Sequence, residues 1–445
     1  MRRPLVLIGN PKSTFVQSMA RYWKERGIEV AIVTAHHWDG PSVNADGVRV
    51  VAAEHGMARE VRSVLDLVLP VLARLESELH RATADRVATA LASWEGGAQP
   101  PSLLPPLADG LAIAAAVNAL SPIAVLGHEA FAYGTATALC TNVRRTLFAW
   151  GGDVLQFCNT SDTAAELMKS ALQRVTYVIA GSRGVQQRII NQFEVPSQRT
   201  AVISLGVNRQ QFAPAPEAKA AEIAARYGIP RGAEVVMNVR RLRPFWGSEV
   251  ALEGLLDLAS RRPRTYLVFL GGLGTEVAMA EARRRAASAG VGSRFIGVDG
   301  DAPLDQVAEL MSISDVFVSL TQQDEPLSLS VLQCAASGGV GVIGDQATYR
   351  EAIDQGLGAV LVNCTSPEEA GGAVDRLLAD RQARLRMRAA NLRYVAQHHD
   401  EDAHMERILR IVVGSEMAER LLAGAASTHS TGRGYKRTRS AIELL

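Results

Sequence analysis

Short apolar runs alternate with stretches of helical spacing along most of the chain. Leu5–Gly9 and Val30–Thr34 resemble strands that a parallel sheet buries on both faces, and Phe15–Arg26 between them spaces its apolar residues as a helix does. This alternation predicts a βαβ unit of a doubly wound α/β fold. No GxGxxG sequence follows the first run, so a nicotinamide-binding domain of the usual kind is not expected.

The first half of the chain continues this alternation after a long interruption. Residues 57–94 have helical spacing, and a proline-rich loop at 96–106 follows them. Four further apolar runs then predict strands at Ile123–Gly127, Thr146–Phe148, Val175–Ala180 and Val202–Leu205. Pro214–Ala221, which reads PAPEAKAA, is the predicted linker to the second half.

The second half repeats the pattern. Its predicted strands are Val235–Val239, Tyr266–Leu270, Arg294–Gly297, Val316–Leu320, Val340–Ile343 and Ala359–Val362. A short helix is predicted at Leu329–Ala336, where Ser328 or Ser330 caps the beginning and Gly338 and Gly339 end it. One more helix, Met405–Ala423, has no strand after it, and Gly424 is a natural place for it to end.

The length of 445 residues favours two domains of roughly 200 residues each. We expect a first Rossmann-like domain at 1–213, with a helical insertion at about 55–108, and a second at 214–400. Residues 401–425 are expected to form a helix that packs back on the first domain. The Ser, Thr, Gly and Arg-rich residues 426–445 lack periodicity and predict a disordered tail.

Composition excludes several classes of protein. A net charge of +1 and an aromatic content of 5% give no basis for nucleic-acid binding. Four scattered cysteines and the absence of a signal-peptide core or of roughly 20 uninterrupted apolar residues predict a cytoplasmic protein. The basic amphipathic stretch 57–94 would also suit a peripheral membrane contact, but such a stripe more often packs on a sheet.

Polar residues gather where the predicted strands of the second half end. Glu325 precedes the predicted helix 329–336, whose first amides suit an anion, and Gln333 lies one turn inside it. Arg240, Arg241 and Arg243 occupy another strand-to-helix loop, where unpaired arginines favour bound phosphate. The pattern predicts a ligand with phosphate and hydroxyl groups. The alternative to a ligand site is that these loops are ordinary βα crossovers of a parallel sheet and that the arginines are exposed to solvent.

In the first half of the chain, fewer polar or charged side chains follow the predicted strands than in the second half. Gly9 and Ser13 flank the turn after the first strand, His128 follows another, and Trp150 leads into Gly151, Gly152 and Asp153. These positions fit a ligand at the carboxyl edge, and they also fit plain turns. His398, His399, Asp400 and His404 lie near the predicted terminal helix without a closed set of ligands, so no metal is expected there.

Taken in order, these signals resemble the family 4 retaining glycosyltransferases of the GT-B fold. The likeness runs from about Leu5 to Val413. The segments that carry it are VRRLRPFWG (239–247), FLGGLG (269–274) and EPLSLSVLQ (325–333), with Ser182-Arg183, Leu205–Asn208 and Phe212–Pro214 in the first half. The last of the three long segments falls on the family's Glu-x7-Glu motif.

The resemblance implies two doubly wound Rossmann-like domains that face a cleft, with a C-terminal helix that crosses back to the first domain. It also implies transfer of a sugar from a nucleotide-sugar donor to an acceptor hydroxyl with retention of configuration. No metal, other cofactor or protein nucleophile is expected. A polysaccharide, a glycoconjugate or a secondary metabolite is the expected kind of product.

Each matched position then has an expected role. Arg241 would clamp the diphosphate with help from backbone amides, since fixed cations and helix amides stabilise the leaving charge. Glu325 would hold donor-sugar hydroxyls, and Gln333 would bind the ribose. Asp153 would contact the acceptor or receive its proton, so the catalytic set is Asp153, Glu325 and Arg241. The donor side comprises Arg240, Arg241, Trp246, Gly271, Gly272, Glu325, Leu327, Ser328, Leu329 and Gln333, and the acceptor side comprises Gly9, Ser13, His128, Trp150 and Asp153.

Four departures from the family pattern bear on activity. Trp246 stands where the family has a phosphate-binding Lys, Trp150 where it has His, and Gln333 where it has the second Glu. Pro326 removes one amide beside the expected phosphates. They favour an alternative, a catalytically silent GT-B protein that binds a partner or a glycan. A nucleotide-sugar epimerase would need further carboxylates and histidines in the cleft, which the sequence does not supply.

Overall fold

The computed structural model describes residues 3–35, 42–44, 46–53, 104–130, 132–155, 158, 162–242, 246–272, 274–300, 302–322 and 326–428. The chain divides into two compact units, one made of 1–203 with 405–445 and the other of Ser204–His404. The sequence placed these divisions after residues 213 and 400 instead. The stretch 57–94, for which packing on a sheet was favoured over a membrane contact, lies outside the described residues. So do the residues of the expected tail from 429 onward and most of the expected insertion.

The first unit is built on a parallel sheet of seven strands in the order β3-β2-β1-β4-β5-β6-β7. Its strands are nearly continuous apolar runs, as expected where helices cover both faces. The edge strand β3 was not expected from the sequence. The strands are β1 Leu5–Ile8, β2 Val30–Thr34, β3 Arg49–Ala52, β4 Ala124–His128, β5 Arg144–Ala149, β6 Tyr177–Ala180 and β7 Thr200–Val202.

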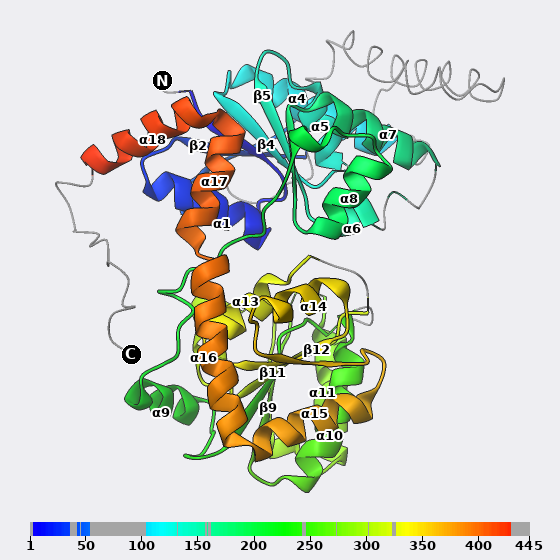
Figure 1. Ribbon diagram of the computed structural model, residues 1–445, viewed down its shortest axis with the longest axis vertical. Helices are drawn as coiled ribbons and strands as arrows, with labels where there is room; N and C mark the ends of the chain where they lie inside the picture. Colours follow the sequence, from blue (N-terminus) through cyan, green and yellow to red (C-terminus); the bar gives the residue numbers. More distant parts are fainter. Residues whose placement is uncertain are drawn as a thin grey trace. The chain divides into compact units, whose positions relative to one another are not determined.

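Helices cover this sheet on both faces. α4, α5 and α7 share one hydrophobic cluster with alternate residues of the strands, while α1 and α17 lie on the other face (Figure 1). Arg144 at the start of β5 donates to the Ile411 carbonyl of α17 at 2.9 Å. The helices are α1 Thr14–Glu25, α4 Leu104–Ala119, α5 Ala132–Leu139, α6 Gly152–Leu155, α7 Asp162–Arg174, α8 Arg183–Asn191, α17 Glu401–Val413 and α18 Ser415–Thr428, with a short 3-10 turn at Ser197–Arg199.

The second unit contains a parallel sheet of six strands in the order β10-β9-β8-β11-β12-β13. All six were predicted from the sequence, with ends that differ by no more than one residue. They are β8 Glu234–Asn238, β9 Thr265–Leu270, β10 Phe295–Val298, β11 Val316–Ser319, β12 Val340–Gly344 and β13 Ala359–Val362.

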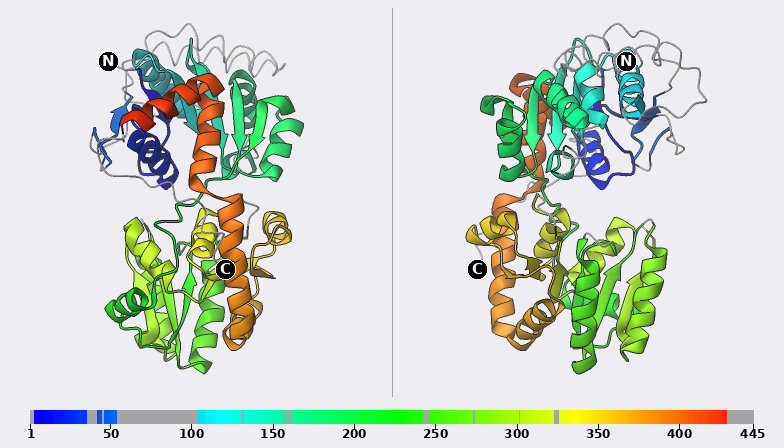
Figure 2. Two further views of the ribbon diagram at one scale, coloured as in Figure 1. Left: turned by 60° about the vertical axis from the view of Figure 1, so that its left-hand side comes forward. Right: turned by 90° about the vertical axis from the view of Figure 1, so that its right-hand side faces the viewer.

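Two hydrophobic clusters fill the two faces of the second sheet. α10, α11 and α15 pack on one face, and α12, α13, α14 and α16 pack on the other (Figure 2). α13 has the bounds that the sequence predicts. The helices are α9 Glu217–Arg226, α10 Ser248–Arg261, α11 Glu276–Ser288, α12 Leu304–Ser312, α13 Leu329–Ala336, α14 Ala347–Asp354, α15 Pro367–Ala379 and α16 Arg381–His398, with a 3-10 turn at Gly292–Arg294.

Two sequence-based predictions are wrong. The expected linker at 214–221 is only partly a linker, because α9 begins inside it at Glu217. Pro216 occupies the N-cap, where a missing N–H costs nothing, and the following Ala-rich stretch favours a helix. The single helix expected at 405–423 is two helices, because Gly414 adopts φ +87° between α17 and α18, and α18 continues past Gly424.

Candidate functional site

Each sheet has one position where its strand order reverses direction. The reversal lies between β1 and β4 in the first unit and between β8 and β11 in the second. Ligands of open parallel sheets bind outside the carboxyl ends of the strands at this position. Most of the residues singled out from the sequence follow the carboxyl ends of these strands or of their neighbours.

Arg241 and Gly272, expected together on the donor side, are in contact. Arg241 follows β8 and is exposed, and its side chain lies over the backbone of Gly272. A Cβ added to Gly272 would be 2.8 Å from the Arg241 Cδ and 2.9 Å from its Nε. Glycine at 272 therefore gives the guanidinium its position. The Arg241 carbonyl accepts a hydrogen bond of 2.7 Å from Ser248 Oγ, which ties this loop to the start of α10.

Two other glycines permit close packing at the same edge. A Cβ on Gly271 would lie 2.6 Å from the Val298 carbonyl oxygen, at the end of β10. Gly247 caps α10 with φ +66°, and a Cβ there would lie 1.9 Å from the Leu320 carbonyl oxygen. Trp246, half-buried, directly precedes it. The loop from β8 is therefore held against the residue that follows β11, and the loop from β9 is held against the end of β10.

Arg240 points to a different partner from Arg241. Its Nε donates to Ser319 Oγ at 2.9 Å, and its guanidinium also hydrogen-bonds to the buried Tyr349 phenol. Burial raises the pKa of Tyr349, while the charge of Arg240 opposes that rise. Arg240 thus joins β8, β11 and α14, and its expected donor-binding role stays a prediction.

The beginning of α13 presents backbone amides without a side-chain cap. Ser328 occupies the N-cap, but its hydroxyl pairs with Ser330 Oγ at 2.9 Å instead of capping the helix. Gln333 is nearly buried, and its side-chain amide has no hydrogen-bonding partner among the described residues. Leu327 and Leu329 are half-buried beside the cap. Glu325 and Arg243 lie outside the described residues.

Unpaired polar atoms also mark this edge of the second sheet. Asn238 Oδ1, Thr321 Oγ1 and Gln346 Oε1 are buried and have no hydrogen-bonding partner in the described part of the chain. They belong to the end of β8, the loop after β11 and the N-cap of α14. Buried polar atoms are normally paired, so these oxygens fit a region that takes up water or a hydroxyl-rich ligand.

In the first unit, an aromatic stack occupies the end of β4 and β5. Trp150 stacks on Phe148 at 3.9 Å and on Phe15 of α1 at 4.3 Å between ring centroids. His128 lies beside it, 5.7 Å away, and Gly9 packs against the His128 ring. Burial lowers the pKa of His128 to about 3, so the imidazole is neutral. These ring contacts show that Trp150 packs within the stack.

Asp153, expected as a catalytic carboxylate, is bound to backbone amides. It is 4% exposed, and it accepts hydrogen bonds from the N–H groups of Ala130, Gly151 and Val154 at 2.7, 2.8 and 2.9 Å. Burial raises its pKa, and these amides oppose the rise. The carboxylate therefore joins the loops that follow β4 and β5.

The sequence places Glu129 with His128 just past a strand, at the carboxyl edge where α/β ligands bind, but only His128 was assigned to the acceptor side. The φ of Glu129 is +80°, and burial, with a smaller contribution from the charge of Asp153, raises its pKa to about 7. Its position one residue past a strand end was the available signal. Ser13, an expected acceptor-side residue in the loop after β1, is the N-cap of α1, and its side chain makes no capping hydrogen bond.

The histidines near the start of α17 are occupied by hydrogen bonds. His399 Nδ1 and Nε2 lie 3.1 Å from Ser204 Oγ and Tyr394 Oη, and His404 lies 2.7 Å from the Ser204 carbonyl. The described residues contain no group of three His, Cys, Asp or Glu side chains placed to hold a metal ion.

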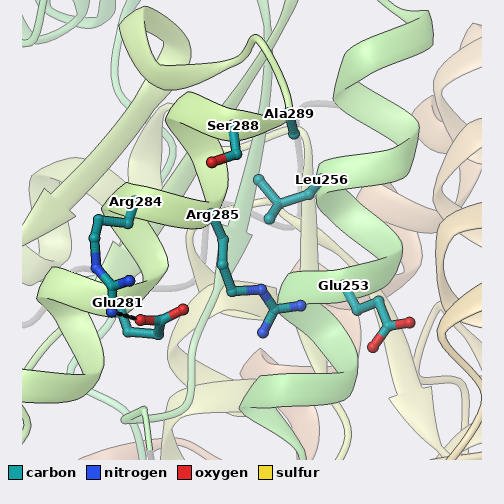
Figure 3. Close-up of a pocket in the computed structure, with 7 residues that line it drawn as sticks. All are labelled: Glu253, Leu256, Glu281, Arg284, Arg285, Ser288 and Ala289. Carbon is teal, nitrogen blue, oxygen red and sulfur yellow. Dashed lines mark ion pairs between the residues drawn. The ribbon is translucent and has the colours of Figure 1, made fainter.

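A surface hollow between α10 and α11 lies apart from these residues (Figure 3). Arg285 of α11 reaches toward α10, where it pairs with Glu249 at 2.9 Å, and Arg284 pairs with Glu281 on its own helix. The hollow is lined by Glu253, Leu256, Glu281, Arg284, Arg285, Ser288 and Ala289. None of the residues expected from the sequence to bind a ligand contributes to it.

Comparison with known proteins matches mainly one part of the chain. The family model described as "Glycosyl transferases group 1" matches residues 219–393, all of them in the second unit. A D-inositol 3-phosphate glycosyltransferase of Thermobispora bispora is 25% identical over 229 residues, 49% of this chain and 52% of that protein. A GDP-mannose-dependent α-(1-6)-phosphatidylinositol monomannoside mannosyltransferase of Mycolicibacterium smegmatis is 28% identical over 212 residues, 46% and 53% of the two chains. The chain thus spans about half the length of these curated relatives.

Solved structures match nearly the whole chain. A glycosyltransferase from Rickettsia africae superposes with a TM-score of 0.66 at 14% identity, over 95% of this chain and 99% of that one. The chain has the GT-B fold. Anabaena HepE, solved with UDP and glucose, superposes with a TM-score of 0.64 at 15% identity, over 94% and 99% of the two chains. None of the helices in the described part of this GT-B chain has the length and hydropathy that a bilayer crossing requires.

Proposed function

We propose that this chain is a glycosyltransferase that moves a sugar from a nucleotide-sugar donor to an acceptor hydroxyl. The observation that carries the proposal is the contact between Arg241 and Gly272 at the strand-order reversal of the second unit. The family model of group 1 glycosyl transferases covers the same region. The names of the curated relatives, which are sugar transferases, point to the same reaction class.

In this proposal Arg241 and the first amides of α13 stabilise the leaving nucleoside diphosphate. Cleavage of the sugar–phosphate bond places negative charge on the diphosphate, and a fixed guanidinium with helix-end amides offsets that charge in the transition state. The uncapped start of α13 supports this role for the amides of Leu329 and Ser330, whereas the N–H of Ser328 donates to the Tyr349 phenol. Gln333, whose amide lacks a partner in the described part of the chain, is proposed to bind the ribose.

Finer features of the reaction follow the family that the sequence resembles. We propose retention of configuration, independence of metal and other cofactors, and family 4 membership. Glu325 is proposed to hold hydroxyls of the donor sugar. Because Anabaena HepE was solved with UDP-glucose, uridine is the first nucleotide to test. A surface polysaccharide, a glycoconjugate or a secondary metabolite is the proposed product.

The proposal is tested by titrating the full chain with uridine, guanosine, adenosine and thymidine diphosphates in a calorimeter. We expect one of the four to bind at micromolar to millimolar concentration and to compete with its sugar conjugates. If none of them binds at millimolar concentration, the enzyme proposal fails and a catalytically silent GT-B protein takes its place.

A further inference from the structure

Tyr349 is a buried tyrosine whose phenol oxygen connects several elements of the second unit. It lies in the first turn of α14, and its side chain has no exposed surface. The phenol hydrogen-bonds to the Arg240 guanidinium after β8, to the side chain of Ser319 at the end of β11, and to the backbone N–H of Ser328. Because Ser328 is the N-cap of α13, one oxygen atom joins two strand ends to the beginning of that helix.

The hydrogen bonds of this cluster, made of Arg240, Ser319, Ser328 and Tyr349, follow from the donors and acceptors available. A phenol oxygen has two lone pairs and one proton to share, and the N–H groups of Ser328 and Arg240 can only donate. The phenol proton is then left for Ser319 Oγ, which also accepts from Arg240 Nε at 2.9 Å. A buried polar cluster in which each group has its partners holds its members in one arrangement.

A second set of contacts fixes the beginning of α14. Gln346, the N-cap residue, donates from Nε2 to the Thr321 carbonyl at 2.5 Å, and the N–H of Tyr349 donates to the Gln346 carbonyl at 3.1 Å. Thr321 belongs to the chain that follows β11. The position of the Tyr349 ring therefore depends on backbone and packing contacts as well as on its hydroxyl group.

The cluster places the charge of Arg240 beside the beginning of α13. Two donors to the same oxygen are close to each other, so the guanidinium lies within about 7 Å of the Ser328 nitrogen. The Ser328 hydroxyl pairs with Ser330 Oγ at 2.9 Å and does not cap the helix. A fixed cation near uncapped amides adds to the positive potential of a helix N-terminus.

We propose that Tyr349 is a positioning residue of the donor site, which holds the charge of Arg240 beside the first turn of α13 for the diphosphate of the donor. The inference rests on the proposed function and adds to it a residue that does not touch the donor. Because Tyr349 is fully buried, it acts through Arg240. Arg240 in turn stabilises the diphosphate as a charge at fixed distance.

The first test compares two Tyr→Phe variants of the full chain by calorimetric titration with the nucleoside diphosphate that the parent chain binds. Tyr349→Phe keeps the ring and removes only the phenol oxygen, so we expect the affinity to fall about fivefold to tenfold. Tyr394→Phe is the matched control, because Tyr394 is also buried in the second unit and its Oη lies 3.1 Å from His399 Nε2. This control should lose a hydrogen bond and keep the affinity of the parent chain.

A double-mutant cycle then separates a positioning role from a structural one. If Tyr349 acts through Arg240, Tyr349→Phe should weaken diphosphate binding less than about twofold when Arg240→Gln is already present. A general loss of structure would weaken binding by the same factor in both backgrounds. Ser319→Ala removes the hydroxyl that both side chains contact, and it takes the place of Arg240→Gln in the cycle if that variant does not fold.

The inference is overturned if Tyr349→Phe binds the diphosphate as tightly as the parent chain, or if Tyr394→Phe loses as much affinity as Tyr349→Phe. It is also overturned if the effect of Tyr349→Phe is the same with and without Arg240. These outcomes leave the proposed function intact as long as the parent chain binds a nucleoside diphosphate. Failure of the parent chain to bind any of them would instead overturn the proposed function itself.

Discussion

At the scale of single residues, hydrogen bonding distinguishes the two carboxylates of the first unit. Asp153 is saturated by three backbone amides, whereas Glu129 has no hydrogen bond to the described residues. The sequence favours Asp153 because it follows two glycines after a strand. It cannot show that Ala130, 23 positions earlier, supplies the decisive amide. The structure therefore shows that Asp153 joins two loops, and its catalytic role stays a prediction.

Replacement of Asp153 tests its structural role. Asp153→Asn puts an NH2 group where a carboxylate oxygen accepts an amide hydrogen, so we expect the free energy of unfolding to fall by about 2 kcal/mol. Urea denaturation followed by circular dichroism measures the change, and the exposed Asp257→Asn serves as control. A variant as stable as the parent chain but without transferase activity would support the catalytic role expected from the sequence.

Glu129 makes stability depend on pH. Its pKa of about 7 in the folded chain exceeds the ordinary value of 4.5, so the folded state binds a proton more tightly than the unfolded state does. The free energy of unfolding should therefore fall as the pH rises from 4.5 to 7, by up to about 3 kcal/mol. Glu129→Gln should lose this part of the pH dependence in denaturation curves. Identical curves for both proteins would show that Glu129 titrates normally.

At the scale of elements, local sequence patterns were sufficient where the relevant contacts are local. The bounds of α13 and the six strands of the second sheet follow from apolar runs and glycine stops. The break at Gly414 and the start of α9 at Glu217 were missed. In both places a single residue sets a helix boundary within a stretch whose other residues favour helix. The contact between Arg241 and Gly272 joins two loops and has no local signature beyond the residue types.

Gly272 is expected to matter for binding more than for stability. Gly272→Ala would place a Cβ against the flexible Arg241 side chain, which moves away, so we expect nucleoside diphosphate affinity to fall about tenfold with little change in Tm. Gly271→Ala meets the Val298 carbonyl instead and should lower the Tm. Calorimetric titration and thermal denaturation separate the two effects. Equal affinity of Gly272→Ala and the parent chain would remove Arg241 from the binding site.

At the scale of the whole molecule, the first unit is assembled from two distant parts of the chain. Residues from Met405 onward belong to it, and α17 buries Met405, Ile408, Leu409 and Val412. The sequence predicts a helix that returns, because no strand is left to follow it. It does not predict the point of division, which depends on contacts between residues 200 positions apart.

Leu409→Ala is therefore expected to weaken the first unit. Removal of a fully buried leucine side chain typically costs about 2–5 kcal/mol. Hydrogen exchange measured by mass spectrometry should accelerate in β1 and β4 and stay unchanged in β8 and β11. Leu385→Ala on α16, where the side chain is 44% exposed, is the control. Faster exchange confined to the second unit would contradict the assignment of α17.

The most direct test of the account is the affinity of the Arg241→Ala variant for the nucleoside diphosphate that the parent chain binds. Loss of a cation that contacts a diphosphate is expected to weaken binding at least about tenfold. Arg386→Ala, an exposed arginine on α16, is the matched control and should leave the affinity unchanged. An Arg241→Ala variant that binds the nucleotide as tightly as the control would contradict the account.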